Sequence, residues 1–296
     1  MGPLFVIGEV AGGKGSCVGY LRDPMRSLLP LMDRAIAAAF AAGAEINAVH
    51  RSQLGVQYKS DASPVTVADL RAHHIIAQVL GNDHPLLSEE GAALPYNDRR
   101  AWDIYWLVDP LDGTKEFIKG NGEFSVNIAL MRNDGDHALP IAGVLYSPVK
   151  DLLYFAWKNG GAYKQENAAT VTGVPTYERA SMSMRLPVQT DREAYTIVAS
   201  RSHLSRQTIE FIKDAERKHG EVRTMNMGSA LKICLVAEGS ADVYPRFGPT
   251  MEWDTAAGHA ICLEAGCELI DATTGKSLPY NKKDLMNTPF IVQRSK

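Results

Sequence analysis

The segment WLVDPLDGTKEF, residues 106–117, constrains this chain more than any other. The apolar residues 104–108 predict a buried strand, which Pro110 and Gly113 are expected to end. The turn that follows would carry four oxygen donors: the carboxylates of Asp109 and Asp112, the Leu111 carbonyl and the Thr114 hydroxyl. Hard oxygen donors suit Mg²⁺ or Mn²⁺, and free N–H groups at such a turn suit a phosphate. Asp-Pro and Asp-Gly are also ordinary turn dipeptides, so an unliganded turn is an equal alternative for this segment alone.

Length and charge limit what the chain can bind. Its 296 residues indicate about two domains or two fused lobes, and its net charge is −3 without any block of Lys or Arg. We therefore expect no nucleic-acid polymer as partner, and an anionic substrate would have to be neutralised locally. The four cysteines lack metal-ligand spacing, which favours a reduced, cytoplasmic protein, and no apolar run is long enough for stable membrane insertion.

The first 26 residues are rich in glycine and lack periodicity, which predicts a flexible extension outside the fold. Residues 8–16 nearly match a phosphate-binding loop, but Gly15 stands where Ser or Thr should hold Mg²⁺, so we expect no such loop.

Periodicity from residue 27 onward predicts a mixed α+β fold. The predicted helices span 27–50, 65–80, 205–218, 229–238 and 254–265. Further strands are predicted at 123–131, 141–147, 152–157, 161–164, 195–200, 222–225 and 241–244, with a polar connector at about 166–193. We infer layers in two fused lobes: 27–165, with helices and an antiparallel meander, and 166–296, with alternating helices and strands.

Three other segments place acids at element ends. Thr66 is a candidate N-cap of the helix at 65–80, and Asp69 three residues later completes a variant of the capping box. Ser-Glu-Glu at 88–90 ends an apolar run, and Asp254 starts the last helix, where it either caps N–H groups or reaches into a cleft.

Together these segments resemble the inositol monophosphatase superfamily of metal-dependent, lithium-sensitive phosphatases. The resemblance runs from about residue 28 to the end and rests on V-T-x-A-D at 65–69, S-E-E at 88–90, W-L-V-D-P-L-D-G-T at 106–114 and W-D-T-A-A-G at 253–258. It implies a layered αβαβα sandwich of the inositol monophosphatase and fructose bisphosphatase type. The segments 112–130, 199–203 and 228–249 look most like the 3'(2'),5'-bisphosphate nucleotidases, whereas residues 115–118 depart from the inositol-specific Asn-Phe-x-His.

The resemblance implies a role for each acid. Glu89, Asp109 and the Leu111 carbonyl would bind one Mg²⁺; Asp109, Asp112 and Asp254 would bind a second, with two or three ions in total and Mn²⁺ able to substitute. The Thr114 hydroxyl, oriented by Asp69, would position the attacking water, and Glu89 would accept its proton. Capping of the helix at 65–80 remains a second explanation for Asp69.

The second phosphate of such a substrate needs a cation beyond the metals. The candidates are Arg201, His203, Lys232 and Arg246, although exposed cations often decorate a surface. The resemblance implies that the substrate contacts Asp112, Gly113, Thr114, His203, Ser229, Lys232, Arg246 and Asp254. For Tyr244 a core position is favoured over a place beside the adenine, and His259 is expected to be a buried structural residue.

The leading hypothesis is a Mg²⁺-dependent phosphatase that removes the 3'-phosphate of adenosine 3',5'-bisphosphate, giving AMP and phosphate. It would also act on the sulfated precursor of that nucleotide and so serve sulfate assimilation. The alternatives are an inositol-phosphate or sugar-phosphate phosphatase on the same scaffold, and a silent homologue that binds nucleotide and regulates a partner. A homodimer is a further expectation from the resemblance.

Overall fold

Most of the chain from residue 24 onward is built around one seven-stranded sheet. The computed structural model describes residues 24–52, 56–58, 64–135, 137–188, 193–200 and 205–295. The strand order is β3-β4-β5-β6-β7-β8-β9, and all neighbours are antiparallel except β3 and β4. The strands are β3 (Leu86–Ser88), β4 (Ile104–Asp112), β5 (Ser125–Asn133), β6 (Ala138–Ser147), β7 (Leu152–Trp157), β8 (Gly161–Glu166) and β9 (Met184–Arg185). The predicted meander is thus confirmed.

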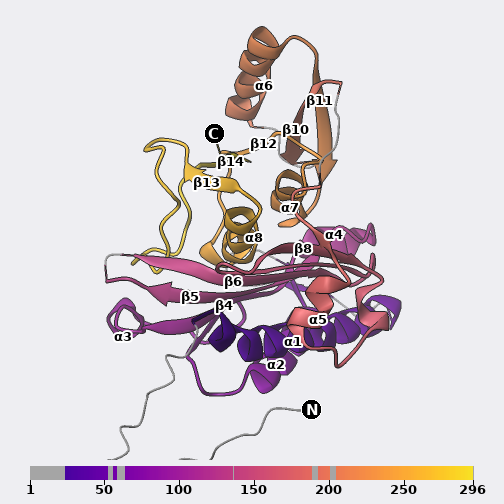
Figure 1. Cartoon of the computed structure of the whole chain (residues 1–296), viewed down its shortest axis with the longest axis vertical. Coiled ribbons are helices and arrows are strands. Elements are labelled where there is room, and N and C mark those ends of the chain that lie inside the picture. Colours follow the sequence, from indigo (N-terminus) through magenta and orange to yellow (C-terminus); the bar gives the residue numbers. More distant parts are fainter. Residues whose placement is uncertain are drawn as a thin grey trace, which may run out of the picture.

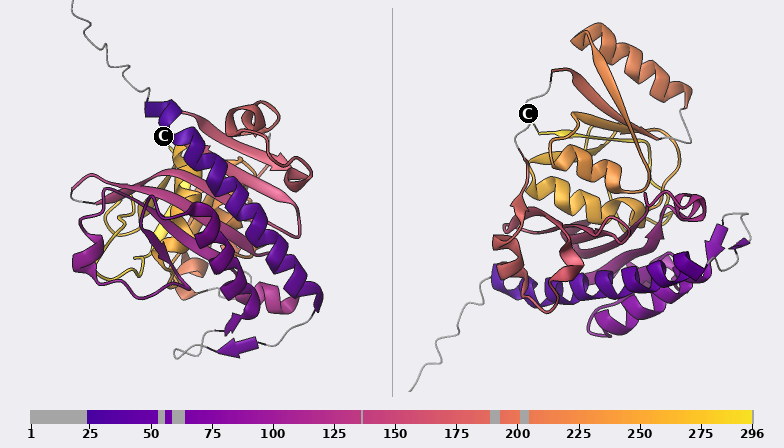
Figure 2. Two further views of the ribbon diagram at one scale, coloured as in Figure 1. Left: turned by 90° about the horizontal axis from the view of Figure 1, so that it is seen from below. Right: turned by 90° about the vertical axis from the view of Figure 1, so that its right-hand side faces the viewer.

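Two helices cover one face of this sheet. They are α1 (Pro24–Ser52) and α2 (Val67–Leu80), which lie side by side beneath the strands in Figures 1 and 2. The Ala-rich stretch of α1 buries Ala38, Ala39, Ala42 and Ile46 completely, so the helix backbone can approach the sheet closely. A short hairpin, β1 (Val56–Tyr58) and β2 (Pro64–Thr66), joins the two helices, and α3 (Tyr96–Arg99) follows β3.

The opposite face of the seven-stranded sheet meets α8 (Glu252–Glu264), which packs beside α7 (Leu231–Ala237). Above these helices lies a five-stranded sheet of order β11-β10-β12-β14-β13, and α6 (Arg206–His219) covers its outer side (Figure 1). Its strands are β10 (Tyr195–Ser200), β11 (Val222–Met227), β12 (Val243–Arg246), β13 (Cys267–Asp271) and β14 (Phe290–Arg294). Helices and sheets therefore alternate as αβαβα, which confirms the predicted fold class.

The prediction that a strand ends before the Asp-Pro turn is wrong. β4 continues through Pro110 to Asp112, and its register with β5 shifts between Asp109 and Asp112. Proline cannot donate to a sheet ladder, so it fits where the regular pairing is interrupted. The carboxylates thus lie on an irregular strand end, and the tight turn begins only at Gly113.

The segment predicted as a polar connector is more ordered than expected. It contains a 3₁₀ turn, η1 (Ala168–Thr170), a helix, α5 (Thr176–Ser181), and β9, which extends the first sheet. Both the N–H and the hydroxyl of Thr176 donate to Asp33 of α1, at 2.6 Å each, and this fixes the start of α5. The boundary between the lobes near residue 165 stays a prediction, while the other predicted elements are present with ends that differ by a few residues.

Candidate active site

The parallel pair β3 and β4 brings two acids to one edge of the sheet. Ser88 is paired with Val108, and the N–H of the next residue, Glu89, donates to the Val108 carbonyl at 3.1 Å. Because β3 and β4 run in parallel, Glu89, just after β3, lies beside Asp109 within β4. Asp109 is only 2% exposed, so its carboxylate is almost fully removed from water.

The end of β4 is shaped by local hydrogen bonds and by one glycine. The Leu111 N–H donates to Asp109 Oδ1 at 3.0 Å, which holds that carboxylate against the chain. Gly113 has a φ of +94°, and a Cβ there would lie 3.2 Å from the Glu123 carbonyl oxygen. Only glycine suits this backbone and this space. The short helix α4 (Thr114–Lys119) begins at the next residue.

The contacts of Asp69 fit both of the roles considered for it. Its Oδ2 accepts hydrogen bonds from the Thr66 N–H at 2.8 Å and the Thr66 hydroxyl at 2.6 Å, as expected for a capping box at the start of α2. Its Oδ1 accepts a hydrogen bond from the Thr114 hydroxyl at 3.2 Å. The helix cap and the orientation of Thr114 are therefore compatible, because each uses a different oxygen.

Asp112 connects the first sheet with the layer above it. Its Oδ2 accepts hydrogen bonds from the Ala230 N–H, just before α7, and from Asn127 Nδ2 at 3.3 Å. Asp254, in the first turn of α8, accepts the Met251 N–H at 2.8 Å and also lines the same cavity as Asp112. Asp254 thus caps its helix and faces the cleft at once.

Four carboxylates, here called the acidic wall, share one electrostatic environment: Glu89, Asp109, Asp112 and Asp254. Burial raises the pKa of Asp109 well above its usual range, and the charges of the three other acids raise it further. Burial and the charge of Asp112 likewise raise the pKa of Asp254. Burial raises the pKa of Asp112, although the charge of Lys232 opposes that rise.

A divalent cation fits the chemistry of the acidic wall. Hard oxygen donors are the ligands that Mg²⁺ prefers, and a bound cation would keep these buried acids ionised. Within the described ranges no three His, Cys, Asp or Glu side chains already form a metal-binding group. The metal assignment of each acid stays a prediction.

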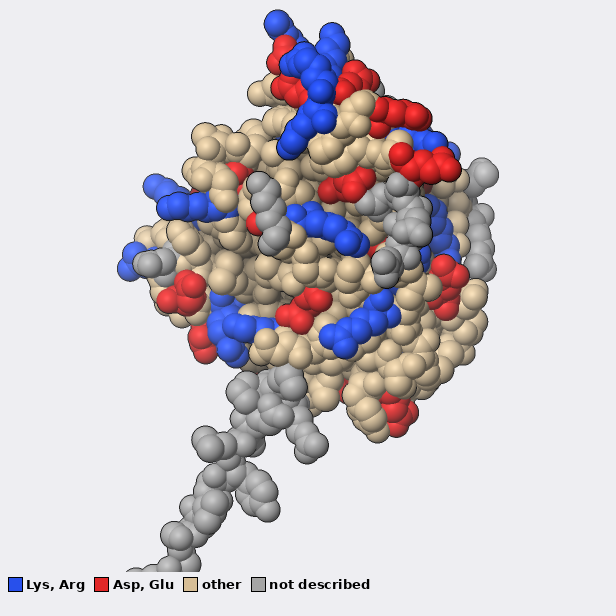
Figure 3. Space-filling model, turned by 45° about the horizontal axis from the view of Figure 1, so that its top comes forward, with Lys and Arg blue, Asp and Glu red and all other residues tan. Residues whose placement is uncertain are grey.

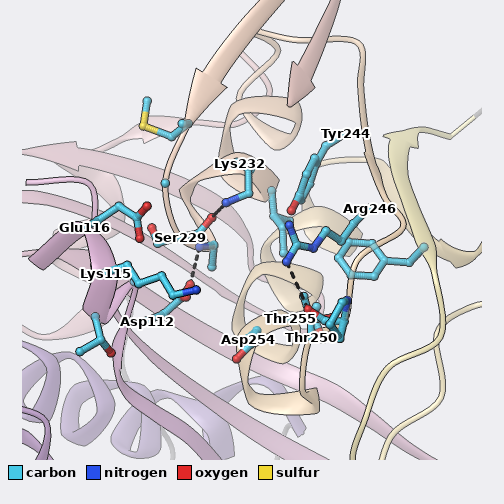
Figure 4. A pocket seen from close by; sticks show the side chains of 18 of the residues that line it. Asp112, Lys115, Glu116, Ser229, Lys232, Tyr244, Arg246, Thr250, Asp254 and Thr255 are labelled. Carbon is cyan, nitrogen blue, oxygen red and sulfur yellow. Dashed lines mark hydrogen bonds between the residues drawn. The ribbon is translucent and has the colours of Figure 1, made fainter. Parts of the chain in front are cut away.

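A cavity of about 390 Å³ lies over the acidic wall and reaches the layer formed by α7 and β12 (Figure 4). Glu89, Asp112, Gly113 and Thr114 line one end. The remaining lining residues are Lys115, Glu116, Met227, Gly228, Ser229, Ala230, Lys232, Ile233, Tyr244, Arg246, Pro249, Thr250, Asp254, Thr255 and Phe290. The structure thus brings together seven of the eight predicted substrate contacts.

Three residues form what we call the cationic wall: Lys232, Tyr244 and Arg246. Lys232 is 7% exposed; its Nζ donates to the Ser229 carbonyl and lies 5.5 Å from the centroid of the Tyr244 ring. Burial lowers the pKa of Lys232 to about 8, against the charge of Asp112, which raises it. Arg246 Nη2 donates to the Pro249 carbonyl at 3.2 Å. Tyr244 is a core residue, as favoured, but it also lines the cavity.

Comparison with known proteins identifies the family. The model of the inositol monophosphatase family matches residues 28–296. This chain belongs to the inositol monophosphatase family. Its members are metal-dependent phosphatases.

Two relatives lie within one branch of this family. The 3'(2'),5'-bisphosphate nucleotidase CysQ of Escherichia coli K12 is 43% identical over 264 residues, 88% of this chain and 97% of that protein. The crystal structure of CysQ from Bacteroides thetaiotaomicron has a TM-score of 0.81 and 48% identity, and covers 90% of this chain and 97% of that one. A more distant structure, the suhB protein of Bartonella henselae, has a TM-score of 0.67 and 26% identity. The family resemblance inferred from the motifs is confirmed.

Some predicted residues lie outside the described part of the chain. These are Arg201, His203 and residues 8–16, the stretch whose sequence nearly matches a phosphate-binding loop. His259 is fully buried, as expected, and its Nδ1 lies 3.0 Å from the Tyr280 hydroxyl. Sequence reasoning did not assign Lys115 and Glu116 to the cavity wall. Both residues lie in the first turn of the helix that starts at Thr114. Because that turn lies beside the cavity, their position could have indicated that they line it.

The face of the molecule drawn in Figure 3 carries charges of both signs. Figure 3 shows Lys and Arg side chains interspersed with Asp and Glu over this face of the molecule. Among the described residues, Lys232 and Arg246 line the cavity and could neutralise an anionic substrate there. None of the helices in the described ranges has the length and apolar character needed to cross a membrane.

Proposed function

We propose that this chain is a phosphatase that removes the 3'-phosphate of adenosine 3',5'-bisphosphate, giving AMP and inorganic phosphate. The observation that carries the proposal is a single cavity with two ends. One end holds Gly113 and Thr114 beside the acidic wall, and the other holds Lys232 and Arg246. A substrate with two separate phosphates matches such a cavity, and the CysQ relatives are named bisphosphate nucleotidases.

The acidic wall would hold Mg²⁺. Glu89, Asp109 and the Leu111 carbonyl are the proposed ligands of one ion, and Asp109, Asp112 and Asp254 of another. When bound, the ions supply positive charge for the phosphoryl group and acidify a water molecule towards neutral pH. We propose two or three ions in the working enzyme, with Mn²⁺ able to substitute for Mg²⁺.

Thr114 and Gly113 would align the attack. Because the Thr114 hydroxyl donates its proton to Asp69, its lone pairs are left to accept a hydrogen bond from the water. Glu89 accepts the second proton of that water as its oxygen forms a bond to phosphorus. The Gly113 N–H donates to a phosphate oxygen. The bond between phosphorus and the ribose 3'-oxygen breaks, its electron pair stays on that oxygen, and the oxygen takes a proton from solvent water. AMP and phosphate leave, and Glu89 returns its proton to solvent.

The cationic wall would hold the rest of the nucleotide. Lys232 is a buried ammonium on an otherwise apolar helix. The charge of Asp112 offsets part of its loss of hydration, and a phosphate bound in the cavity would offset more. We assign Lys232, Arg246 and Ser229 to the 5'-phosphate end, and His203 is retained as a proposed contact.

The proposal can be tested with a substrate panel. Phosphate release in Mg²⁺ would be measured from adenosine 3',5'-bisphosphate, its sulfated precursor, inositol 1-phosphate and fructose 1,6-bisphosphate. We expect kcat/KM for the bisphosphate nucleotide to exceed that for inositol 1-phosphate by more than about tenfold. A smaller preference would favour the inositol-phosphate alternative, and no turnover of any substrate would favour the silent homologue.

Three further properties belong to the same proposal: inhibition by Li⁺, a cytoplasmic location and assembly into a homodimer. Each has its own measurement, namely turnover in LiCl, cell fractionation and the mass of the protein in solution.

A further inference from the structure

One side chain joins the two ends of the cavity without lining it. Glu123, in the loop between α4 and β5, accepts a hydrogen bond from the Gly228 N–H at 2.9 Å through its Oε2. The two residues are 105 positions apart, and the bond is buried. Glu123 is 9% exposed and its own N–H donates to Asn121 Oδ1 at 2.9 Å, so the loop that carries it is itself held in place.

The backbone of Glu123 also touches two glycines, one from each end of the cavity. A Cβ on Gly228 would lie 2.5 Å from the Glu123 carbonyl oxygen and 2.8 Å from Glu116 Cγ. A Cβ on Gly113 would lie 3.2 Å from the same carbonyl oxygen. The turn at Gly113, here called the phosphate turn, and the segment before α7 therefore both lie against the carbonyl of one residue.

The segment held by Glu123 leads directly to both walls. Ser229 has a φ of +51°, a left-handed conformation that a non-glycine residue keeps only when its surroundings enforce it. In that conformation the Ser229 carbonyl accepts the bond from Lys232 Nζ, and the next N–H, of Ala230, donates to Asp112. Any shift of Gly228 would thus displace the group that orients Lys232.

We propose that Glu123 is a positioning residue that sets substrate specificity. By fixing Gly228 against the phosphate turn, it sets the separation between Gly113 and Lys232, and hence the separation of the two phosphates that the cavity accepts. The inference rests on the proposed function and deepens it. A substrate with one phosphate does not span the two ends, so its turnover should depend little on this spacing.

The test compares Glu123→Ala with Glu123→Gln. The glutamine keeps an oxygen that can accept the Gly228 N–H, whereas alanine leaves that donor buried without this acceptor. For Glu123→Ala we expect KM for adenosine 3',5'-bisphosphate to rise by about tenfold or more, with kcat and the turnover of inositol 1-phosphate changed by less than about threefold. Asp112 keeps Asn127 as a donor, so the shared chemistry is spared. Glu123→Gln should restore most of the specificity.

Two further measurements distinguish a positioning role of Glu123 from an effect on folding and from a direct role in catalysis. The Kd of adenosine 3',5'-bisphosphate, measured by calorimetry in Mg²⁺-free buffer so that it is not hydrolysed, should rise in Glu123→Ala in parallel with KM, and the Tm shows whether the variant is folded. Gly228→Ala, which forces the backbone away from the Glu123 carbonyl, should shift specificity in the same direction.

Equal losses on both substrates, or a glutamine variant that behaves as alanine does, would overturn the inference while leaving the proposed function intact. If the native chain fails to hydrolyse the bisphosphate, the proposed function is wrong, and the inference that rests on it is wrong as well.

Discussion

The acidic wall and the cationic wall face one cavity, yet they are built differently. The acids come mainly from strand ends and helix starts. Leu111 and Met251 hold Asp109 and Asp254 through N–H groups close to them in the chain, whereas Asp112 accepts the N–H of Ala230 from the layer above. In the cationic wall Lys232 and Arg246 donate to nearby carbonyls, but the wall also depends on the packing of two elements, because Lys232 on α7 lies over Tyr244 on β12.

Substitutions in the two walls should therefore have different effects on activity. Local hydrogen bonds fix Asp109 and Asp254, and Asp112→Asn would keep an oxygen for its distant donor, so a change of charge in the acidic wall should remove the chemistry while the fold persists. The cations are positioned by the packing of α7 against the second sheet, so a change there should alter which substrate is held.

The largest effect is expected for Asp112→Asn. The amide oxygen can still accept the Ala230 N–H, so the variant should fold, but it lacks the charge proposed to hold a metal ion. Phosphate release from every substrate should fall by about a thousandfold or more, with Tm nearly unchanged. Asp98→Asn, an exposed residue of α3 that does not line the cavity, is the matched control. Full turnover by the Asp112 variant would remove that residue from the proposed metal site.

A smaller loss is expected for Thr114→Ala, because only the orientation of the water depends on this hydroxyl. We expect kcat to fall by about a hundredfold on nucleotide and inositol substrates alike, with KM little changed. Thr114→Ser keeps the hydroxyl that donates to Asp69 and should recover most of kcat. A serine variant as slow as the alanine variant would indicate that packing of the methyl group, rather than the hydroxyl, matters.

The smallest effect is a pH dependence confined to the cationic wall. Because burial lowers the pKa of Lys232 to about 8, its ammonium is protonated below that pH and neutral above it. KM for the bisphosphate nucleotide should therefore rise by about tenfold between pH 7 and pH 9, whereas KM for inositol 1-phosphate should not.

The variant Lys232→Met is the control for this titration. It should have a high KM for the nucleotide at both pH values, because it has no ammonium to lose. A rise in KM with pH that persists in this variant would assign the titration to another group.

The sequence indicated the acidic wall well because its signals are local. A carboxylate that ends a strand or caps a helix is specified by residues within a few positions of it, as Asp69 and Thr66 illustrate. The buried strands between 123 and 164 could also be predicted from the sequence, since their apolar runs are bounded by turn residues.

The elements that were missed depend on distant partners. β9 has only two residues, both exposed, and exists because it pairs with β8. The course of β4 through Pro110 depends on where β5 interrupts its pairing. The hydrogen bond between Glu123 and Gly228 joins residues 105 positions apart, and no periodicity in either segment predicts it. Such features follow from packing, which a single sequence does not display.

Local unfolding at Asp69, in the first turn of α2, should be enough to abolish activity. The same carboxylate closes the first turn of α2 and holds the Thr114 hydroxyl, so fraying of that turn and release of the hydroxyl are one event. The first turn of a helix opens at far lower free energy than the whole domain. Heat or denaturant should thus silence the enzyme while both sheets are still assembled, and a ligand that fixes Thr114 should slow hydrogen exchange at the Thr66 and Ala68 amides.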